Sequence, residues 1–226
     1  MNLKSLSKIM NAPSYNPKMD EMPVFISYPR SGSHWLNCLM ELYFDAPRLR
    51  RSVTFLQGES LNKKPLWFHD HDIFSILELK HDDVLYLYRN PVDVIFSHLK
   101  SEYNGKINEE FIDKEIKLLI NHFNKYLLSN KAKVIVKYEK LKSNDYNEFQ
   151  KIIDWLTPGY DLNINKLDKI NSIVKKSNII NKANNKQFLN KKLLSDEYKY
   201  ERDKFKNKYS DKINAKIISS KLEEFF

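Results

Sequence analysis

The stretch VFISYPRSGSHWLNCLMELYF, residues 24–44, decides the fold that the sequence predicts. An apolar run stops at Tyr-Pro, a short polar loop follows, and an amphipathic run then begins. This order is typical of a buried strand, a loop and a helix. In open α/β sheets, ligands bind beyond the carboxyl ends of the strands, which is where such a loop lies. The loop is therefore a candidate binding site.

The loop PRSGSHW, residues 29–35, has the composition of an anion site. The N–H groups at a helix N-terminus attract anions, and Gly32 permits a close backbone approach or a positive φ. Ser31 and Ser33 add hydroxyl donors, and Arg30 adds a guanidinium fork that suits phosphate or sulfate oxygens. The loop lacks the Lys-Ser/Thr pair of the GxxxxGK[ST] loop of ATPases. Taken alone, an ordinary strand-to-helix turn with a capping Ser would also explain it.

A second segment, LYLYRNPVDVIFSHL at residues 85–99, again predicts a strand, a polar turn and a helix. Asn90 is suited to cap the helix, a proline occupies the first helical position, and Asp93 would complete a shortened capping box. Arg89 has no such structural explanation. A charged residue at the end of a buried strand points at whatever the sheet edge binds, and Ser97, two turns into the helix, could share that face.

Apolar runs and helical patterns alternate along the whole chain. Strands are predicted at 23–28, 65–69, 83–88 and 133–138, and helices at 34–44, 91–103, about 111–127 and 146–156. This alternation predicts an α/β fold with a mainly parallel sheet covered by helices on both faces. Residues 1–21 are predicted to be a loosely ordered lead-in. Residues 22–226 are predicted to form one domain, which is helical and Lys-rich from about 160.

The two strand-end segments, taken together, resemble the sulfotransferase family. YPRSGSHWL resembles its 5′-phosphosulfate loop, commonly Tyr-Pro-Lys/Arg-Ser-Gly-Thr-Thr-Trp-Leu, and YRNPVDVIFSHL resembles its 3′-phosphate motif. VKYEKL, residues 136–141, is similar to the family's Tyr-Glu-Asp-Leu. The resemblance extends from about residue 23 to 157. It implies a P-loop-like three-layer fold that transfers a sulfuryl group from 3′-phosphoadenosine 5′-phosphosulfate (PAPS) to a hydroxyl or amine, releases the bisphosphate PAP, and needs no metal.

The same resemblance implies a set of nucleotide contacts. The residues matched to the 5′-phosphosulfate loop are Arg30, Ser31, Gly32, Ser33 and His34. Those matched to the adenine site are Trp35 and Tyr138, and those matched to the 3′-phosphate site are Arg89 and Ser97. Three departures stand out: Arg replaces the common Lys, His replaces the second Thr, and the late Arg-Lys-Gly loop is absent. Lys191 and Lys192 could substitute for that loop, although a solvated helix surface explains them as well.

The family's general base is usually a His after a short strand between the two motifs. PLWFHDHDIF, residues 65–74, offers His69 and His71. His69 is preferred because it directly follows LWF and lies twenty residues before the arginine of the second motif; an imidazole there can accept the acceptor's proton. His71 is the alternative. Asp70 or Asp72 could orient the imidazole. The His-Asp-His-Asp alternation could also indicate a metal site, but no further ligands are evident in the sequence.

Composition sets the remaining expectations. Lys and Arg total 38 against 29 acidic residues, a formal charge of +9, which indicates an anionic partner or a biased surface composition. Arg48, Arg50 and Arg51 suggest an acidic acceptor, or simply a solvated loop. The only cysteine, Cys38, cannot form a disulfide within the chain.

No signal-peptide pattern or membrane-spanning run is evident, so a cytoplasmic protein is expected. Two other functions stay open. A nucleotide kinase is disfavoured by the missing Lys-Ser/Thr pair. A non-enzymatic nucleic-acid-binding protein would leave both strand-end motifs unexplained, so no nucleic acid is expected as a partner.

Overall fold

The structure is a computed structural model that describes residues 22–49, 56–75, 77–78, 83–103, 107–128, 132–176 and 195–226. The predicted lead-in at 1–21 lies outside these ranges. So do Lys191 and Lys192, the two lysines that were suggested to replace the late Arg-Lys-Gly loop. The described residues include a four-stranded sheet in the order β2-β1-β3-β4, and every neighbouring pair is parallel. The strands are β1 (Val24–Ser27), β2 (Phe68–Asp70), β3 (Val84–Tyr88) and β4 (Val134–Lys137).

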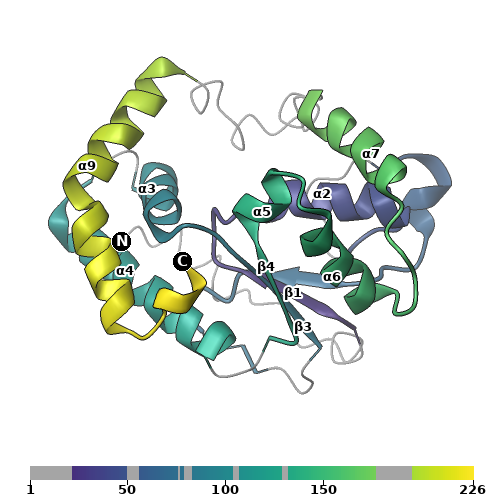
Figure 1. The fold of residues 1–226 in the computed structure, drawn as a ribbon, viewed down its shortest axis with the longest axis horizontal. Coiled ribbons are helices and arrows are strands. Elements are labelled where there is room, and N and C mark those ends of the chain that lie inside the picture. The colour runs from purple at the N-terminus through teal and green to yellow at the C-terminus, as the bar shows by residue number, and fades with distance from the viewer. Residues whose placement is uncertain are drawn as a thin grey trace.

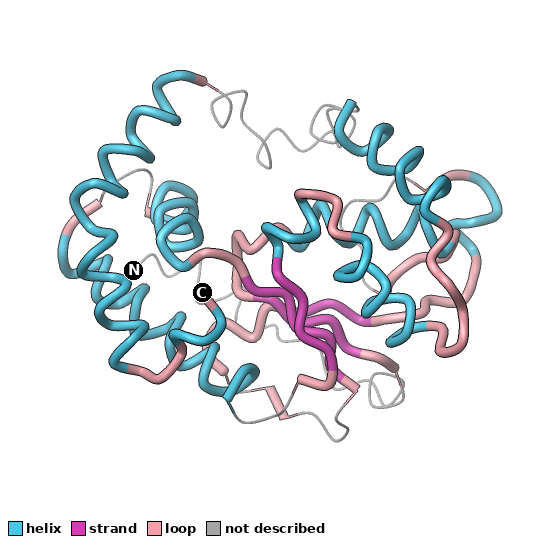
Figure 2. The backbone as a smooth tube through the Cα atoms, in the orientation of Figure 1, coloured by secondary structure: helices cyan, strands magenta, loops and turns pink. Residues whose placement is uncertain are grey.

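Helices cover both faces of this sheet (Figures 1 and 2). One face packs against α2 (Ser33–Phe44), α5 (Tyr138–Lys142), α6 (Tyr146–Leu156) and α7 (Ile164–Lys176), and the other against α3 (Pro91–Glu102), α4 (Glu109–Phe123) and α9 (Asp196–Ser219). The short elements are η2 (Gly58–Asn62), the π-helical turn η3 (Asn124–Leu128) and η5 (Glu223–Phe225). The chain therefore has the P-loop-like α/β fold with a mainly parallel sheet that its sequence predicted.

The core alternates along each strand. Phe25 of β1 packs with the α2 face, whereas Val24 and Ile26 pack with the α3 face, and all three side chains are buried. Alternation arises because successive side chains of a strand point to opposite sides of the sheet. Since both sides are covered, the strand sequences read as unbroken apolar runs.

The order of the strands creates a topological switch point, where ligands bind in open α/β sheets. β1 lies between β2 and β3, and the helices that follow β1 and β3 lie on opposite faces of the sheet. A crevice forms at such a switch point, outside the carboxyl ends of the two strands. The two motif-bearing loops therefore meet at one place, as the sequence predicted.

Several element boundaries differ from the prediction by a few residues, and two of the differences bear on the site. β2 begins at Phe68 rather than at 65, because the preceding residues pair with the segment after α2: the Leu66 N–H donates to the Pro47 carbonyl, and Trp67 accepts from the Leu49 N–H. Tyr138 does not extend β4 but begins the short helix α5.

Within the described part of the chain, no helix is long and apolar enough to cross a membrane. The cytoplasmic location and the single domain stay predictions.

Candidate active site at the carboxyl edge of the sheet

The turn between β1 and α2 has an unusual backbone. Arg30 and Gly32 have positive φ angles of 70° and 99°, and Gly32 is the N-cap of α2. A Cβ atom on Gly32 would overlap the ring of Tyr138. Both the left-handed conformation and the close approach therefore require glycine here, which confirms the sequence-based expectation.

The same turn offers donors to an anion. A helix leaves the N–H groups of its first turn without intrahelical acceptors, and within the described residues no side chain caps α2. The Ser31 side chain is buried, and its hydroxyl has no hydrogen-bond partner among the described residues. Ser33 is buried as well. A buried hydroxyl without a partner is costly unless a ligand satisfies it, so the turn is well suited to bind phosphate or sulfate oxygens.

The turn between β3 and α3 is bonded directly to the first one. The Arg89 Nη1 donates to the Arg30 carbonyl oxygen at 3.1 Å, and the Arg30 Nε donates to the Ser97 Oγ at 3.0 Å. Burial lowers the pKa of Arg30, and nearby Arg89 lowers it further. Two arginines on turns that are bonded to each other, in a partly buried place, favour a multiply charged anion.

Asn90 caps α3 as predicted, accepting hydrogen bonds from the N–H groups of Val92 and Asp93. The predicted capping box is wrong in one respect. The Asn90 N–H donates to the Glu139 carboxylate, at 2.9 Å, rather than to Asp93. Asp93 instead forms an ion pair with Lys206 of α9. The cap thereby ties α3 to α5, which begins with Tyr138.

Aromatic rings form one side of the crevice. Trp35 and Tyr138 meet edge to face with centroids 5.9 Å apart, and the Arg89 guanidinium lies over the Tyr138 ring at 4.7 Å. The Lys142 ammonium lies 5.1 Å over the Trp35 ring. Flat apolar rings next to cations are suited to a base that carries phosphate groups.

His69 and His71 both approach Ser27, the last residue of β1. The Ser27 hydroxyl lies 3.3 Å from His69 Nε2 and 3.4 Å from His71 Nδ1, and His71 Nδ1 lies 2.8 Å from the Ser27 carbonyl oxygen. A carbonyl can only accept, so His71 Nδ1 carries the proton and its Nε2 has the lone pair. With His71 Nδ1 as a donor, the Ser27 hydroxyl can donate its own hydrogen to His69 Nε2.

The histidines of this crevice are neutral near pH 7. Burial lowers the pKa of His69 well below its usual value and lowers that of His71, for which the bond to Ser27 acts in the opposite direction. Burial and the neighbouring His71 and arginines lower the pKa of His34 to about 4. A neutral imidazole is the form that can accept a proton from a hydroxyl.

Three sequence-based suggestions are wrong. Arg48 does not face an acceptor, because it is buried and its Nη1 bonds Glu41 at 2.8 Å; Arg50 and Arg51 lie outside the described residues. Asp72 does not orient an imidazole, because its carboxylate accepts from Lys125 and from other groups of the fold. The orienting acceptor of His71 is a main-chain carbonyl. The Asp70 carboxylate accepts from the Asp72 N–H and does not orient an imidazole either.

The structure brings the other proposed nucleotide residues to one edge, apart from Lys191 and Lys192, which are not described. It also adds residues that sequence reasoning missed, above all Ser27 and Lys142. Ser27 carried a signal, since it is a buried polar residue that ends an apolar strand. Lys142 carried none among so many lysines. Among the described residues, no three His, Cys, Asp or Glu side chains are grouped so that they could hold a metal ion.

The fold is that of the P-loop-like α/β proteins, with both motif-bearing turns at the carboxyl edge of the sheet. The crystal structure of mouse sulfotransferase SULT7A1 complexed with PAP has this fold, with a TM-score of 0.50 and 18% sequence identity; the match covers 92% of this chain and 91% of that one. At this identity the likeness establishes the fold. No family model and no curated protein match the sequence.

Proposed function

We propose that the protein is a sulfotransferase that takes the sulfuryl group from PAPS and transfers it to a hydroxyl or amine of an acceptor. The observation that carries the proposal is the direct bonding of the two strand-end motifs through Arg30, Arg89 and Ser97. The structural neighbour, a sulfotransferase bound to PAP, supports the same conclusion at the level of the fold. PAPS has two anionic ends, and two adjacent anion-binding turns suit such a ligand.

The proposal gives each turn its own end of the nucleotide. The N-terminus of α2, with Arg30, Ser31 and Ser33, faces the 5′-phosphosulfate, and Arg89 with Ser97 faces the 3′-phosphate. Trp35 and Tyr138 hold the adenine between the turns. In sulfuryl transfer a new bond forms between the acceptor oxygen and sulfur while the bond from sulfur to the 5′-phosphate oxygen breaks. Arg30 then stabilises the charge that grows on the leaving phosphate.

A histidine of the pair at the carboxyl end of β2, His69 or His71, takes the acceptor's proton. The sequence spacing favours His69. The hydrogen bonds favour His71, because the Nε2 lone pair of His71 is left for the acceptor, while His69 Nε2 faces the Ser27 hydroxyl. Either imidazole is neutral near pH 7 and can act as the base.

Nucleotide binding is the first test. PAP should raise the melting temperature far more than AMP, because a ligand that binds only the folded state stabilises it by mass action and AMP lacks the 3′-phosphate. Arg89→Ala should remove the difference, while Lys206→Ala, a charge removed from α9, should keep it. Equal shifts by PAP and AMP in the wild type would refute the 3′-phosphate assignment.

Transfer is the second test. Radiolabelled PAPS is offered with a panel of sugars, phenols, alcohols, amines and peptides. Arg30→Ala should lower turnover by about 10²–10³-fold with smaller loss of PAP affinity, as for removal of an oxyanion donor. Of His69→Ala and His71→Ala, the variant that loses about 10²–10⁴-fold in turnover identifies the base. Turnover of Mg-ATP in place of PAPS would favour a kinase instead. Steeply salt-dependent binding of nucleic acid, without transfer, would favour a binding protein.

A further inference from the structure

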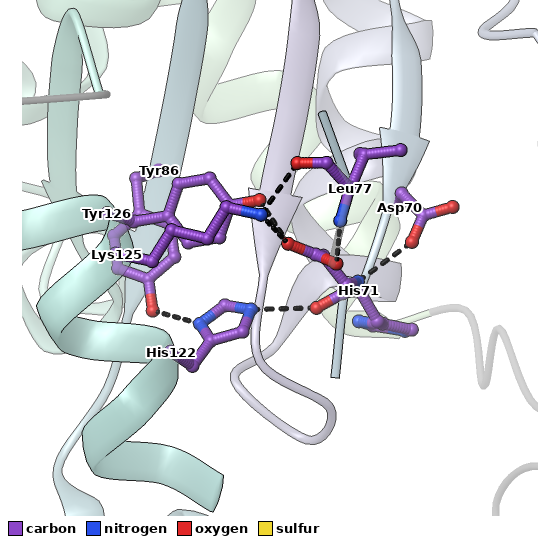
Figure 3. Close-up of polar contacts among 8 residues, drawn as sticks. Asp70, His71, Leu77, Tyr86, His122, Lys125 and Tyr126 are labelled. Carbon is purple, nitrogen blue, oxygen red and sulfur yellow. Dashed lines mark hydrogen bonds and ion pairs between the residues drawn. The ribbon is translucent and has the colours of Figure 1, made fainter. Parts of the chain in front are cut away.

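The segment after β2 is hydrogen-bonded to α4 and to the π-helical turn η3, which lie on the α3 face of the sheet. His122 of α4 lies 2.7 Å from the His71 carbonyl oxygen, through its Nε2 (Figure 3). Lys125 and Tyr126 of η3 both donate to the Asp72 Oδ2, at 2.7 and 2.5 Å. The wider π-helical turn lets two successive side chains reach one carboxylate, and such turns are frequent at functional sites.

His122 can donate to His71 in only one tautomer. Because the His71 carbonyl can only accept, His122 Nε2 carries the proton, and Nδ1 then accepts from the Tyr86 hydroxyl at 2.7 Å (Figure 3). Burial lowers the pKa of His122 to about 4, and burial raises that of Tyr86. Tyr86 therefore stays protonated as the donor, and His122 stays neutral with a fixed donor nitrogen.

The peptide group between His71 and Asp72 is held at both ends. Its carbonyl accepts from His122, and its N–H donates to the Asp70 carboxylate at 2.8 Å. Asp72 has a φ of 40° and also accepts from the Leu77 N–H at 2.8 Å, which fixes the turn that follows. A non-glycine residue in this backbone conformation persists only where its surroundings hold it there.

We propose that His122 is a positioning residue for His71, acting through the main chain. The Tyr86 hydroxyl sets the tautomer of His122, His122 holds the His71 carbonyl, and the Ser27 carbonyl holds the His71 ring. Together these bonds direct the His71 Nε2 lone pair into the crevice at the sheet edge. The inference rests on the proposed function in one respect, namely that His71 is the base that accepts the proton of the acceptor group.

A set of matched variants tests the proposal. His122→Phe keeps a ring of similar size but removes the donor, and His122→Gln restores a donor amide near the position of Nε2. Tyr86→Phe removes only the hydroxyl that sets the tautomer, and is the milder variant if His122→Phe folds poorly. Ile213→Ala is the control. Ile213 is buried in the apolar cluster on the α3 face of the sheet, so its truncation lowers stability, but its side chain forms no hydrogen bond and its loss removes none of the bonds to His71.

Two readouts separate positioning from general destabilisation. Imidazole nitrogen NMR of the free protein should show His71 protonated at Nδ1 alone in the wild type, in His122→Gln and in Ile213→Ala, and as mixed tautomers in His122→Phe. With PAPS and an acceptor, kcat should fall about 10–100-fold in His122→Phe, as small misplacements of a reacting group do. PAP affinity should stay unchanged, and His122→Gln should recover most of the rate.

The two hypotheses can fail separately. If the wild type transfers no sulfuryl group to any acceptor, the proposed function fails, and the NMR comparison still decides whether His122 fixes the His71 tautomer. If the wild type is active but His122→Phe loses no more kcat than Ile213→Ala, or keeps a single His71 tautomer, the positioning role is refuted.

Discussion

Acidification should destabilise the protein through His122. The side chain is fully buried, and burial lowers its pKa from the ordinary 6.5 to about 4, against smaller opposite effects of the bond to the His71 carbonyl and of Asp72. In the unfolded chain the imidazole titrates near 6.5. Between these pH values the unfolded chain binds a proton that the folded one does not. The free energy of unfolding therefore falls as pH drops from about 6.5 to about 4.

The size of this effect follows from the two pKa values. The gap between 6.5 and about 4 corresponds to about 3 kcal/mol when fully developed, since each pKa unit is worth about 1.4 kcal/mol. Linkage places most of this loss, about 2–3 kcal/mol, between pH 7.5 and pH 4.5, because at the lower pH the unfolded imidazole is protonated and the folded one is still largely neutral.

Urea unfolding of the wild type and of His122→Gln, at both pH values, measures the effect. The glutamine amide does not titrate, so the wild type should lose about 2–3 kcal/mol more than the variant on going from pH 7.5 to 4.5. The other histidines and the carboxylates titrate in both proteins and cancel in the comparison. Equal losses in the two proteins would show that His122 is not kept neutral by burial, and the tautomer argument would fall with it.

Three substitutions probe the rest of the site, each by urea unfolding at pH 7.5. Gly32→Ala should cost at least about 1–2 kcal/mol for the positive φ, plus displacement of Tyr138, and should weaken PAP binding. Asn90→Ala should cost about 1 kcal/mol, because it removes the α3 cap, with little change in the α2 turn. Glu115→Leu should cost at least about 1–3 kcal/mol, because it leaves the buried His98 without its 2.6 Å hydrogen-bond partner; a loss below 1 kcal/mol would show that the pair is not needed for folding.

The sequence was sufficient for the fold and for the location of the site because both depend on local patterns. Buried parallel strands read as apolar runs, and the residue after each run must lie at the carboxyl edge. Arg30 and Arg89 were found in this way, 59 positions apart in the sequence yet bonded in the structure. Gly32 was found because a tight turn and a close approach both demand glycine.

Contacts that depend on how distant elements pack could not be predicted in this way. The choice between His69 and His71 depends on which imidazole nitrogen meets Ser27, more than forty positions away. Asp72 appeared to be a partner for an imidazole because it lies next to His71 in the sequence. Its carboxylate instead accepts from Lys125 of η3, 53 positions later, and sequence spacing does not reveal such a contact.

Buried polar groups beneath the sheet edge link the site to the helices on the α3 face. Glu115 accepts from both the Tyr28 hydroxyl, at 2.9 Å, and His98, at 2.6 Å. The Tyr28 ring also meets His122 edge to face at 5.3 Å. Apolar side chains of similar volume would often be as stable as a buried polar pair, so stability alone does not explain these groups. Their bonds hold Tyr28, at the start of the first motif loop, and His98, in the helix that follows the second motif loop. This supports a site whose geometry depends on the packing of α3 and α4 against the sheet.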